Sequence, residues 1–120
     1  ELVGGVFVEH PAASTTNGSV EYVFPFSVLR TQSRHPSTEG VEPFGVHDEF
    51  YIERHSSGID VHMVAIDRGV AHPVVWTREH GNGRVARITL GHDTRTWNLP
   101  AYRRLVTQAV GWLVTSSRPS

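Results

Sequence analysis

Hydrophobic and polar residues alternate along several segments of the chain, and this pattern predicts about five or six β-strands. The clearest alternation covers residues 20–29, where every second residue is apolar. Pro25 lies within this segment, and because proline cannot donate a hydrogen bond to a neighbouring strand, we expect it at a sheet edge or a bulge. Residues 61–66 are apolar on both faces, which is typical of a buried central strand. The other predicted strands cover residues 2–8, 44–52, 73–79 and 84–90.

The C-terminal part of the chain carries the strongest local signals. Asn82-Gly83 separates residues 73–79 from residues 84–90 and predicts a β-hairpin that turns at this dipeptide, with a positive φ at one or both residues. Apolar residues then recur at helical spacing over residues 98–114, which predicts one long helix. Its apolar stripe consists of Leu99, Tyr102, Leu105, Val106, Ala109, Val110 and Leu113. One helix covers one face of a sheet, so the other face needs a cover from upstream sequence or from another subunit.

Composition narrows the functional classes. Of the 120 residues, 38% are hydrophobic and 19% are charged, which is typical of a single globular domain. We expect this domain over residues 1–114 and a flexible tail over residues 115–120. The 11 basic and 12 acidic residues nearly balance, and no apolar run reaches the roughly 20 residues of a membrane helix, so we expect neither nucleic acid nor a membrane as partner. The chain has no cysteine, which excludes disulfides and thiolate chemistry and is compatible with the cytoplasmic location that we expect.

The alternation over residues 44–52 places a carboxylate among apolar side chains. Asp48 shares the parity of Val46 and Phe50, so a strict alternation buries it. A buried carboxylate needs a hydrogen-bonding partner, a metal ion or a raised pKa. Three interpretations remain open: a bulge turns Asp48 outward, a structural arginine pairs with it, or Asp48 or Glu49 belongs to a functional site.

Two histidines follow predicted strands. His10 comes after residues 2–8, and His92 lies beside Asp93 directly after residues 84–90. If both strands are parallel members of one sheet, both histidines lie at the edge where open α/β sheets place their ligands. Two imidazoles and a carboxylate could hold Zn²⁺ or a similar divalent metal, which makes His10 and His92 candidate metal ligands. In the alternative interpretation, Asp93 is a turn or helix-capping residue and His92 an ordinary polar loop residue.

Several segments, taken together, resemble a known family. They are GVFVEHP at 5–11, HP at 35–36 followed by a glycine, FGVHDEFY at 44–51, and the block 73–97 with its GNGRV and LGHD motifs. This combination resembles the ThuA-like family, named for trehalose utilisation, over nearly the whole chain and in the family's order. The resemblance implies a class I glutamine amidotransferase-like fold that is related to flavodoxin, and a chain that holds only the C-terminal part of the domain. We therefore expect an α/β fold with a partial doubly wound, mixed sheet, a C-terminal hairpin and one long C-terminal helix.

The resemblance also implies a set of functional positions. The family's recurrent polar positions correspond here to His10, His35, Asp48, Glu49, Tyr51, His92 and Asp93. The catalytic residues that we predict are His10, Asp48, Glu49 and His92. The substrate-binding residues that we predict are His35, Tyr51, Asp93 and Trp97, the last as an aromatic platform. The amidotransferase cysteine is absent, so that chemistry is not implied, and Glu9 stands where the family usually has a glycine.

Different classes of function remain open. One is an enzyme, or part of one, that acts on a small carbohydrate such as trehalose or a related disaccharide, with the histidines binding a metal or moving protons. Another is a truncated, non-catalytic module that binds a partner chain or a sugar, and a third is a purely structural role. Half of a doubly wound sheet exposes a strand edge and an apolar face, so we expect a homo-oligomer or a complex with the missing N-terminal half.

Overall fold

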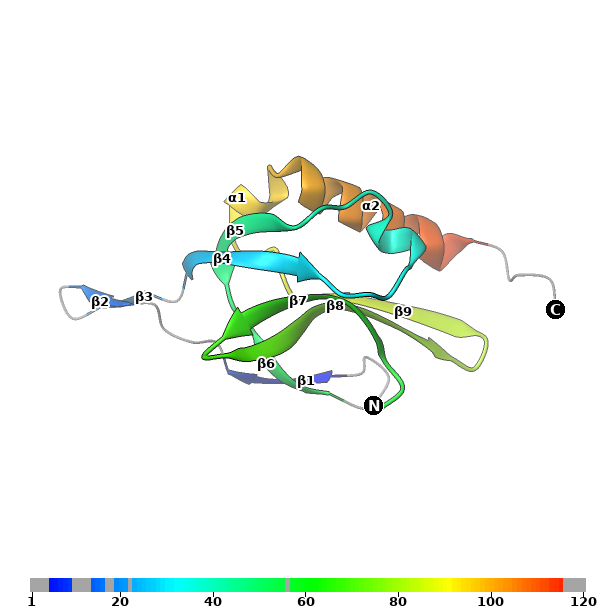
Figure 1. The fold of residues 1–120 in the computed structure, drawn as a ribbon, viewed down its shortest axis with the longest axis horizontal. Helices are drawn as coiled ribbons and strands as arrows, with labels where there is room; N and C mark the ends of the chain where they lie inside the picture. Colours follow the sequence, from blue (N-terminus) through cyan, green and yellow to red (C-terminus); the bar gives the residue numbers. More distant parts are fainter. Residues whose placement is uncertain (1–4, 10–13, 17–18, 22, 56, 116–120) are drawn as a thin grey trace.

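The computed structural model describes residues 5–9, 14–16, 19–21, 23–55 and 57–115. Strands dominate the first three quarters of the chain and helices the last quarter (Figure 1). In chain order the elements are β1 (Gly5–Glu9), β2 (Ser14–Thr16), β3 (Ser19–Glu21), β4 (Val23–Arg30), η1 (Pro36–Thr38), β5 (Phe44–Glu49), β6 (Ile52–His55), β7 (Asp60–Asp67), β8 (Val70–His80), β9 (Gly83–Ile88), α1 (Thr94–Trp97) and α2 (Pro100–Val114).

The central sheet has five strands in the order β5-β4-β7-β8-β9, and each of its pairs is antiparallel. The mixed α/β class is confirmed, but the expected doubly wound sheet is not found in the described part of the chain. The reason is the connections: two-residue turns join β7 to β8 and β8 to β9, whereas parallel neighbours need long crossovers. The strand predicted at residues 61–66 is central, as expected, because β7 is the third of the five.

Pro25 lies where the sheet is only partly paired. β4 is placed between β5 and β7, but only Leu29 and Arg30 pair with β7. Pro25 is paired with His47 of β5. It lies in the first half of β4, which has no pairing with β7 among the described residues. This is the environment in which a sheet tolerates proline, as predicted from the sequence.

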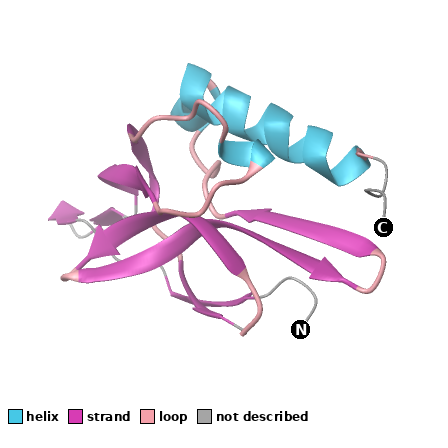
Figure 2. Ribbon diagram, turned by 45° about the vertical axis from the view of Figure 1, so that its right-hand side comes forward, coloured by secondary structure: helices cyan, strands magenta, loops and turns pink. Residues whose placement is uncertain are grey.

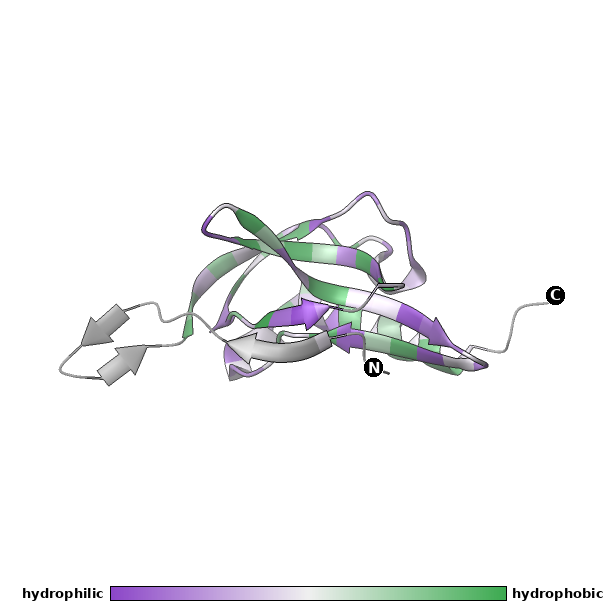
Figure 3. Cartoon of the chain, turned by 90° about the horizontal axis from the view of Figure 1, so that it is seen from below, coloured by the Kyte–Doolittle hydropathy of each residue, from purple (hydrophilic) through white to green (hydrophobic). Residues whose placement is uncertain are grey.

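The sheet is covered on both faces. The helix α2 packs on one face together with η1, and the antiparallel ribbon of β1 and β6 lies across the other (Figures 1 and 2). Contacts through the second layer include the His55 and Trp76 rings, whose centroids are 4.7 Å apart, and the ion pair of Arg87 with Glu53. The second cover that the sequence left unidentified is therefore a β-ribbon of the chain itself. Hydrophobic and hydrophilic residues succeed each other along the strands of the central sheet (Figure 3).

The C-terminal helix begins two residues later than predicted, with Pro100 in its first turn, where proline is tolerated. A separate short helix, α1, precedes it and was not predicted. Tyr102, Leu105 and Ala109 are buried, but Val110 is 52% exposed, so the predicted apolar stripe is covered only along its first part. In the described part of the chain, neither helix is long and apolar enough to cross a membrane.

The predicted hairpin is confirmed, with its turn one residue earlier than expected. His80 pairs with Gly83, so the turn residues are Gly81 and Asn82. Gly81 has a φ of +59°, whereas neither Asn82 nor Gly83 has a positive φ. Glycine at the first turn position with a positive φ is the requirement of a type II′ turn, which matches the twist of the flanking strands.

Candidate functional site

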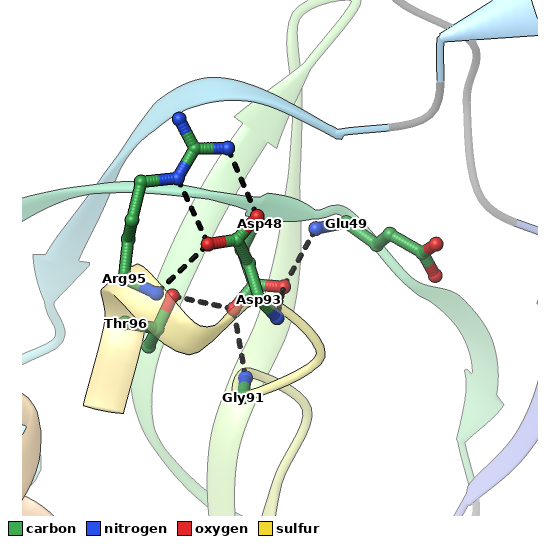
Figure 4. Close-up of polar contacts among 6 residues, drawn as sticks. All are labelled: Asp48, Glu49, Gly91, Asp93, Arg95 and Thr96. Atoms are coloured by element: carbon green, nitrogen blue, oxygen red, sulfur yellow. Dashed lines mark hydrogen bonds and ion pairs between the residues drawn. The ribbon is translucent and has the colours of Figure 1, made fainter. Parts of the chain in front are cut away.

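Asp48 is fully buried at the end of β5, as the alternation predicts, and its carboxylate holds the turn between β9 and α1 (Figure 4). Its Oδ1 accepts hydrogen bonds from the backbone N–H groups of Glu49 (2.8 Å) and Asp93 (3.0 Å). Its Oδ2 accepts from the backbone N–H of Gly91 (2.8 Å) and from the hydroxyl of Thr96 (2.6 Å). Four short hydrogen bonds offset the cost of burying the carboxylate.

Neither structural explanation considered for Asp48 describes its surroundings. The side chain points into the core, and the donors around it are backbone amides and a hydroxyl instead of an arginine. A side chain without exposed surface acts through the groups that it holds. We therefore treat Asp48 as a positioning residue, which ties the turn at residues 91–96 to β5.

This turn brings His92 to Glu49. His92 Nε2 lies 3.1 Å from Glu49 Oε2; the imidazole side chain is 53% exposed and the carboxylate side chain only 13%. Tyr51 donates a hydrogen bond to the same carboxylate, and burial, followed by this bond and the charge of Glu49, raises the pKa of Tyr51 to about 12. Three of the predicted residues thus form one group, with the carboxylate inside and the imidazole outside. We name Glu49, Tyr51 and His92 the Glu49 cluster.

Asp93 caps the short helix α1. Its Oδ1 accepts a hydrogen bond from the backbone N–H of Arg95 at 2.8 Å, as a helix-capping carboxylate does. Nε and one terminal nitrogen of the Arg95 guanidinium bind the two carboxylate oxygens, each at 2.9 Å (Figure 4). These bonds hold the pKa of Asp93 well below its usual range. The capping role that one interpretation gave to Asp93 is therefore present, beside the Glu49 cluster.

Trp97 lies against the turn that carries His92. Its Nε1 donates a hydrogen bond to the Gly91 carbonyl at 2.9 Å, and its ring meets Tyr102 edge-on. Half of the Trp97 surface is exposed. Gly91 has a φ of +112°, and a Cβ there would collide with the Tyr102 hydroxyl. Glycine at this position therefore allows both the turn and the close approach of the two aromatic residues.

His35 lies away from the Glu49 cluster. It caps η1, and its ring packs against Trp112, with centroids 4.6 Å apart. Trp112 is 12 residues beyond Pro100, about 18 Å along α2 from the helix end that adjoins α1. The two ends are well separated in Figure 1. The structure thus brings Glu49, Tyr51, His92, Asp93 and Trp97 together around the turn that Asp48 holds, and leaves His35 apart.

The family is decided by comparison with known proteins. A family model described as ThuA, trehalose utilisation, matches residues 1–113. The chain belongs to the ThuA family. The resemblance stated from the sequence motifs is confirmed, whereas no curated protein and no solved structure matches this chain.

The metal prediction for this ThuA-family chain rested on parallel strands, and this premise is wrong. β1 pairs with β6 in an antiparallel ribbon and does not belong to the sheet that contains β9. In the described ranges, no group of three or more histidine, aspartate or glutamate side chains could hold a metal ion. His10 lies outside the described residues, so its roles as a catalytic residue and as a metal ligand with His92 stay predictions.

A second polar network of the ThuA-family chain surrounds His62, which the sequence analysis did not single out. His62 is buried in β7, with Nε2 2.7 Å from the Thr77 hydroxyl and Nδ1 3.1 Å from the Ser33 hydroxyl. Ser33 donates its one hydroxyl proton to Asp60, so Nδ1 of His62 donates to Ser33 and Nε2 accepts from Thr77. The sequence offered one indication of this network, a histidine inside an otherwise apolar strand segment.

This network predicts acid sensitivity. Burial first, and then the charge of the neighbouring His35, lower the pKa of His62 to about 4. Between pH 6.5 and pH 4 the unfolded chain takes up a proton that the folded chain excludes, so stability falls as the pH falls through this window. We expect His62 to contribute roughly 2–3 kcal/mol to this loss.

The measurement is urea unfolding at pH 7, 5.5 and 4 for the wild type and for His62→Gln, which cannot titrate. Burial also lowers the pKa values of His35 and His55, so only the difference between the two proteins reports on His62. Stability curves that run parallel in the two proteins over this range would show that His62 is not the acid-sensitive group.

Proposed function

We propose that this ThuA-family chain serves carbohydrate utilisation by binding a sugar hydroxyl at the Glu49 cluster and moving a proton to or from it. The observation that carries the proposal is the 3.1 Å contact between His92 Nε2 and the Glu49 carboxylate. A neutral imidazole that donates from Nε2 keeps Nδ1 as a proton acceptor. About half of the His92 side chain is exposed, and the proposal places the sugar hydroxyl at its Nδ1.

Each residue around His92 has a separate task in this proposal. Glu49 fixes the orientation of the imidazole and stabilises the imidazolium that forms when Nδ1 takes a proton, the task of a carboxylate beside a catalytic histidine. Tyr51 keeps its own proton over the working pH range, because its pKa is raised to about 12, and remains a hydrogen-bond donor to Glu49. Trp97 offers a half-exposed ring on which the C–H face of a sugar can pack.

The proposed ligand is trehalose or a related disaccharide. The family description, trehalose utilisation, supports this class, and a disaccharide offers the hydroxyl groups that the Glu49 cluster would bind. We keep the cytoplasmic location and an assembly with a second copy or with another chain as parts of the same proposal.

The test is a titration of the protein with trehalose, followed through the NMR resonances of the His92 imidazole. We expect these resonances to shift, and the shift to be weakened in Glu49→Gln, in which the carboxylate is lost. His80→Gln, at the exposed end of β8, is the matched control and should leave the titration unchanged. If neither trehalose nor maltose shifts the His92 resonances, the proposal is wrong.

The same samples separate an enzyme from a binding module. Loss of the trehalose NMR signals on long incubation, slowed at least about 100-fold in His92→Gln, is expected for a general acid–base catalyst. Binding at His92 with the sugar unchanged would instead support the non-catalytic module.

A further inference from the structure

A groove of about 480 Å³ lies over β4 and β5 beside Arg95, and the function proposed above does not use it. Its volume lies within the range of small-ligand sites. The residues that line it include Pro25 and Ser27 of β4, Gly45 and His47 of β5, Arg95 of α1, and Leu99.

The groove and the Glu49 cluster lie along one row of β5. Val46 and Asp48 face the core, so Gly45, His47 and Glu49 share the opposite face of the strand. Ser27 is paired with Gly45, and Pro25 with His47, so β4 continues this surface sideways. From Gly45 to Glu49 the row extends about 13 Å, longer than a single sugar ring needs.

The chemistry of the groove suits a neutral, hydroxylated ring. Pro25 and Leu99 offer apolar surface for C–H groups, and His47 and Ser27 offer hydrogen-bonding groups. Arg95 contributes little free positive charge, because Asp93 binds its guanidinium through two hydrogen bonds of 2.9 Å. A phosphate or carboxylate would therefore find no uncompensated cation on this wall of the groove.

Gly45 keeps the groove open. A Cβ added there would meet only the Phe26 carbonyl oxygen, at 4.0 Å, and no positive φ requires glycine at this position. Glycine inside a strand weakens the strand and often marks a place where a ligand comes close to the backbone. The backbone conformation therefore does not require glycine at position 45, and the absent side chain leaves open space in the groove.

We propose that this groove binds the second ring of a disaccharide whose first ring lies against the Glu49 cluster. Gly45 determines the specificity for a two-ring ligand by leaving the space, and His47 by contacting the ring hydroxyls. This inference rests on the proposed function, because the Glu49 cluster defines the position of the first ring.

The test compares the affinities for trehalose and for glucose in the wild type and in Gly45→Val, measured by NMR titration. Valine suits a strand and fills the groove without touching the Glu49 cluster. We expect Gly45→Val to weaken trehalose binding about tenfold or more, toward the affinity for glucose, and to leave glucose binding unchanged. Gly111→Val is the matched control, because Gly111 lies on the exposed side of α2 with nothing within 4 Å of an added Cβ.

Three results would count against the inference in different ways. Equal trehalose affinity in the wild type and in Gly45→Val would overturn the second-ring site and leave the proposed function standing. Shifts confined to Gly45 and His47, with His92 silent, would refute the proposed function and with it the two-ring arrangement. If Gly45→Val does not fold, His47→Ala replaces it, and an unchanged ratio of trehalose to glucose affinity in that variant overturns the inference.

Discussion

Replacing Asp48 with alanine is expected to lower the free energy of unfolding by about 3–5 kcal/mol. The substitution removes the carboxylate that accepts four hydrogen bonds. The backbone N–H groups of Glu49, Gly91 and Asp93 and the Thr96 hydroxyl then lose this acceptor in a buried environment. Domains of this size are stable by only about 5–15 kcal/mol, so the loss is a large part of the total. Chemical denaturation followed by circular dichroism measures it.

A matched control for Asp48→Ala is Glu42→Gln. Glu42 is also acidic, but its side chain is 83% exposed and lies 4.0 Å from Arg30, so its removal should change stability by less than about 0.5 kcal/mol. Similar small effects of both substitutions would mean that Asp48 does not hold the turn at residues 91–96. Asp48→Asn should fall between the two variants, because its amide retains one acceptor oxygen.

Leu105→Ala is expected to cost about 2–5 kcal/mol, the second large effect. Leu105 is completely buried where α2 packs on the sheet, in the same apolar cluster as Val28, Met63 and Val75. The truncation removes apolar contact and leaves a cavity that the neighbouring strands can close only in part. Thermal and urea unfolding should both show the loss.

Val110→Ala, three positions further along the predicted stripe, provides the comparison. Val110 is half exposed, and alanine is the better helix former, so we expect a change within about 0.5 kcal/mol of zero. A loss at Val110 as large as that at Leu105 would indicate that a second molecule covers this end of α2 in solution. The pair of variants therefore also tests the predicted assembly.

The elements were readable from the sequence because their signals are local. Alternation predicted β4 and β5, a continuous apolar run predicted β7, the Asn-Gly dipeptide predicted the hairpin, and helical spacing predicted α2. Outside this hairpin, the direction of the strands could not be predicted. The ribbon of β1 and β6, for example, joins segments about 45 residues apart, and no local pattern indicates this pairing. The expectation of a doubly wound sheet came from the family resemblance. It is not met in the described residues, because two-residue turns join antiparallel neighbours there.

The candidate site could be predicted only in part, because only some of its features have local signals in the sequence. The parity of Asp48 correctly predicted a buried carboxylate, but its partners, which lie 43 to 48 residues away apart from Glu49, could not be inferred. The contact of His92 with Glu49 depends on this long-range anchor. The His62 network combines residues from three separate segments, and Arg95 and His47 acquire their place at the groove only through the packing of α1 beside β5.

The long sequence separation of the Asp48 hydrogen bonds has a consequence for the order of folding. The β8–β9 hairpin closes across two residues and can form within microseconds, whereas the bond from Gly91 to Asp48 closes a loop of 43 residues. Chain entropy opposes such closure until the intervening strands are in register. We therefore expect the turn that carries His92 to dock after the rate-limiting step, so that Asp48→Ala accelerates unfolding and leaves the refolding rate nearly unchanged.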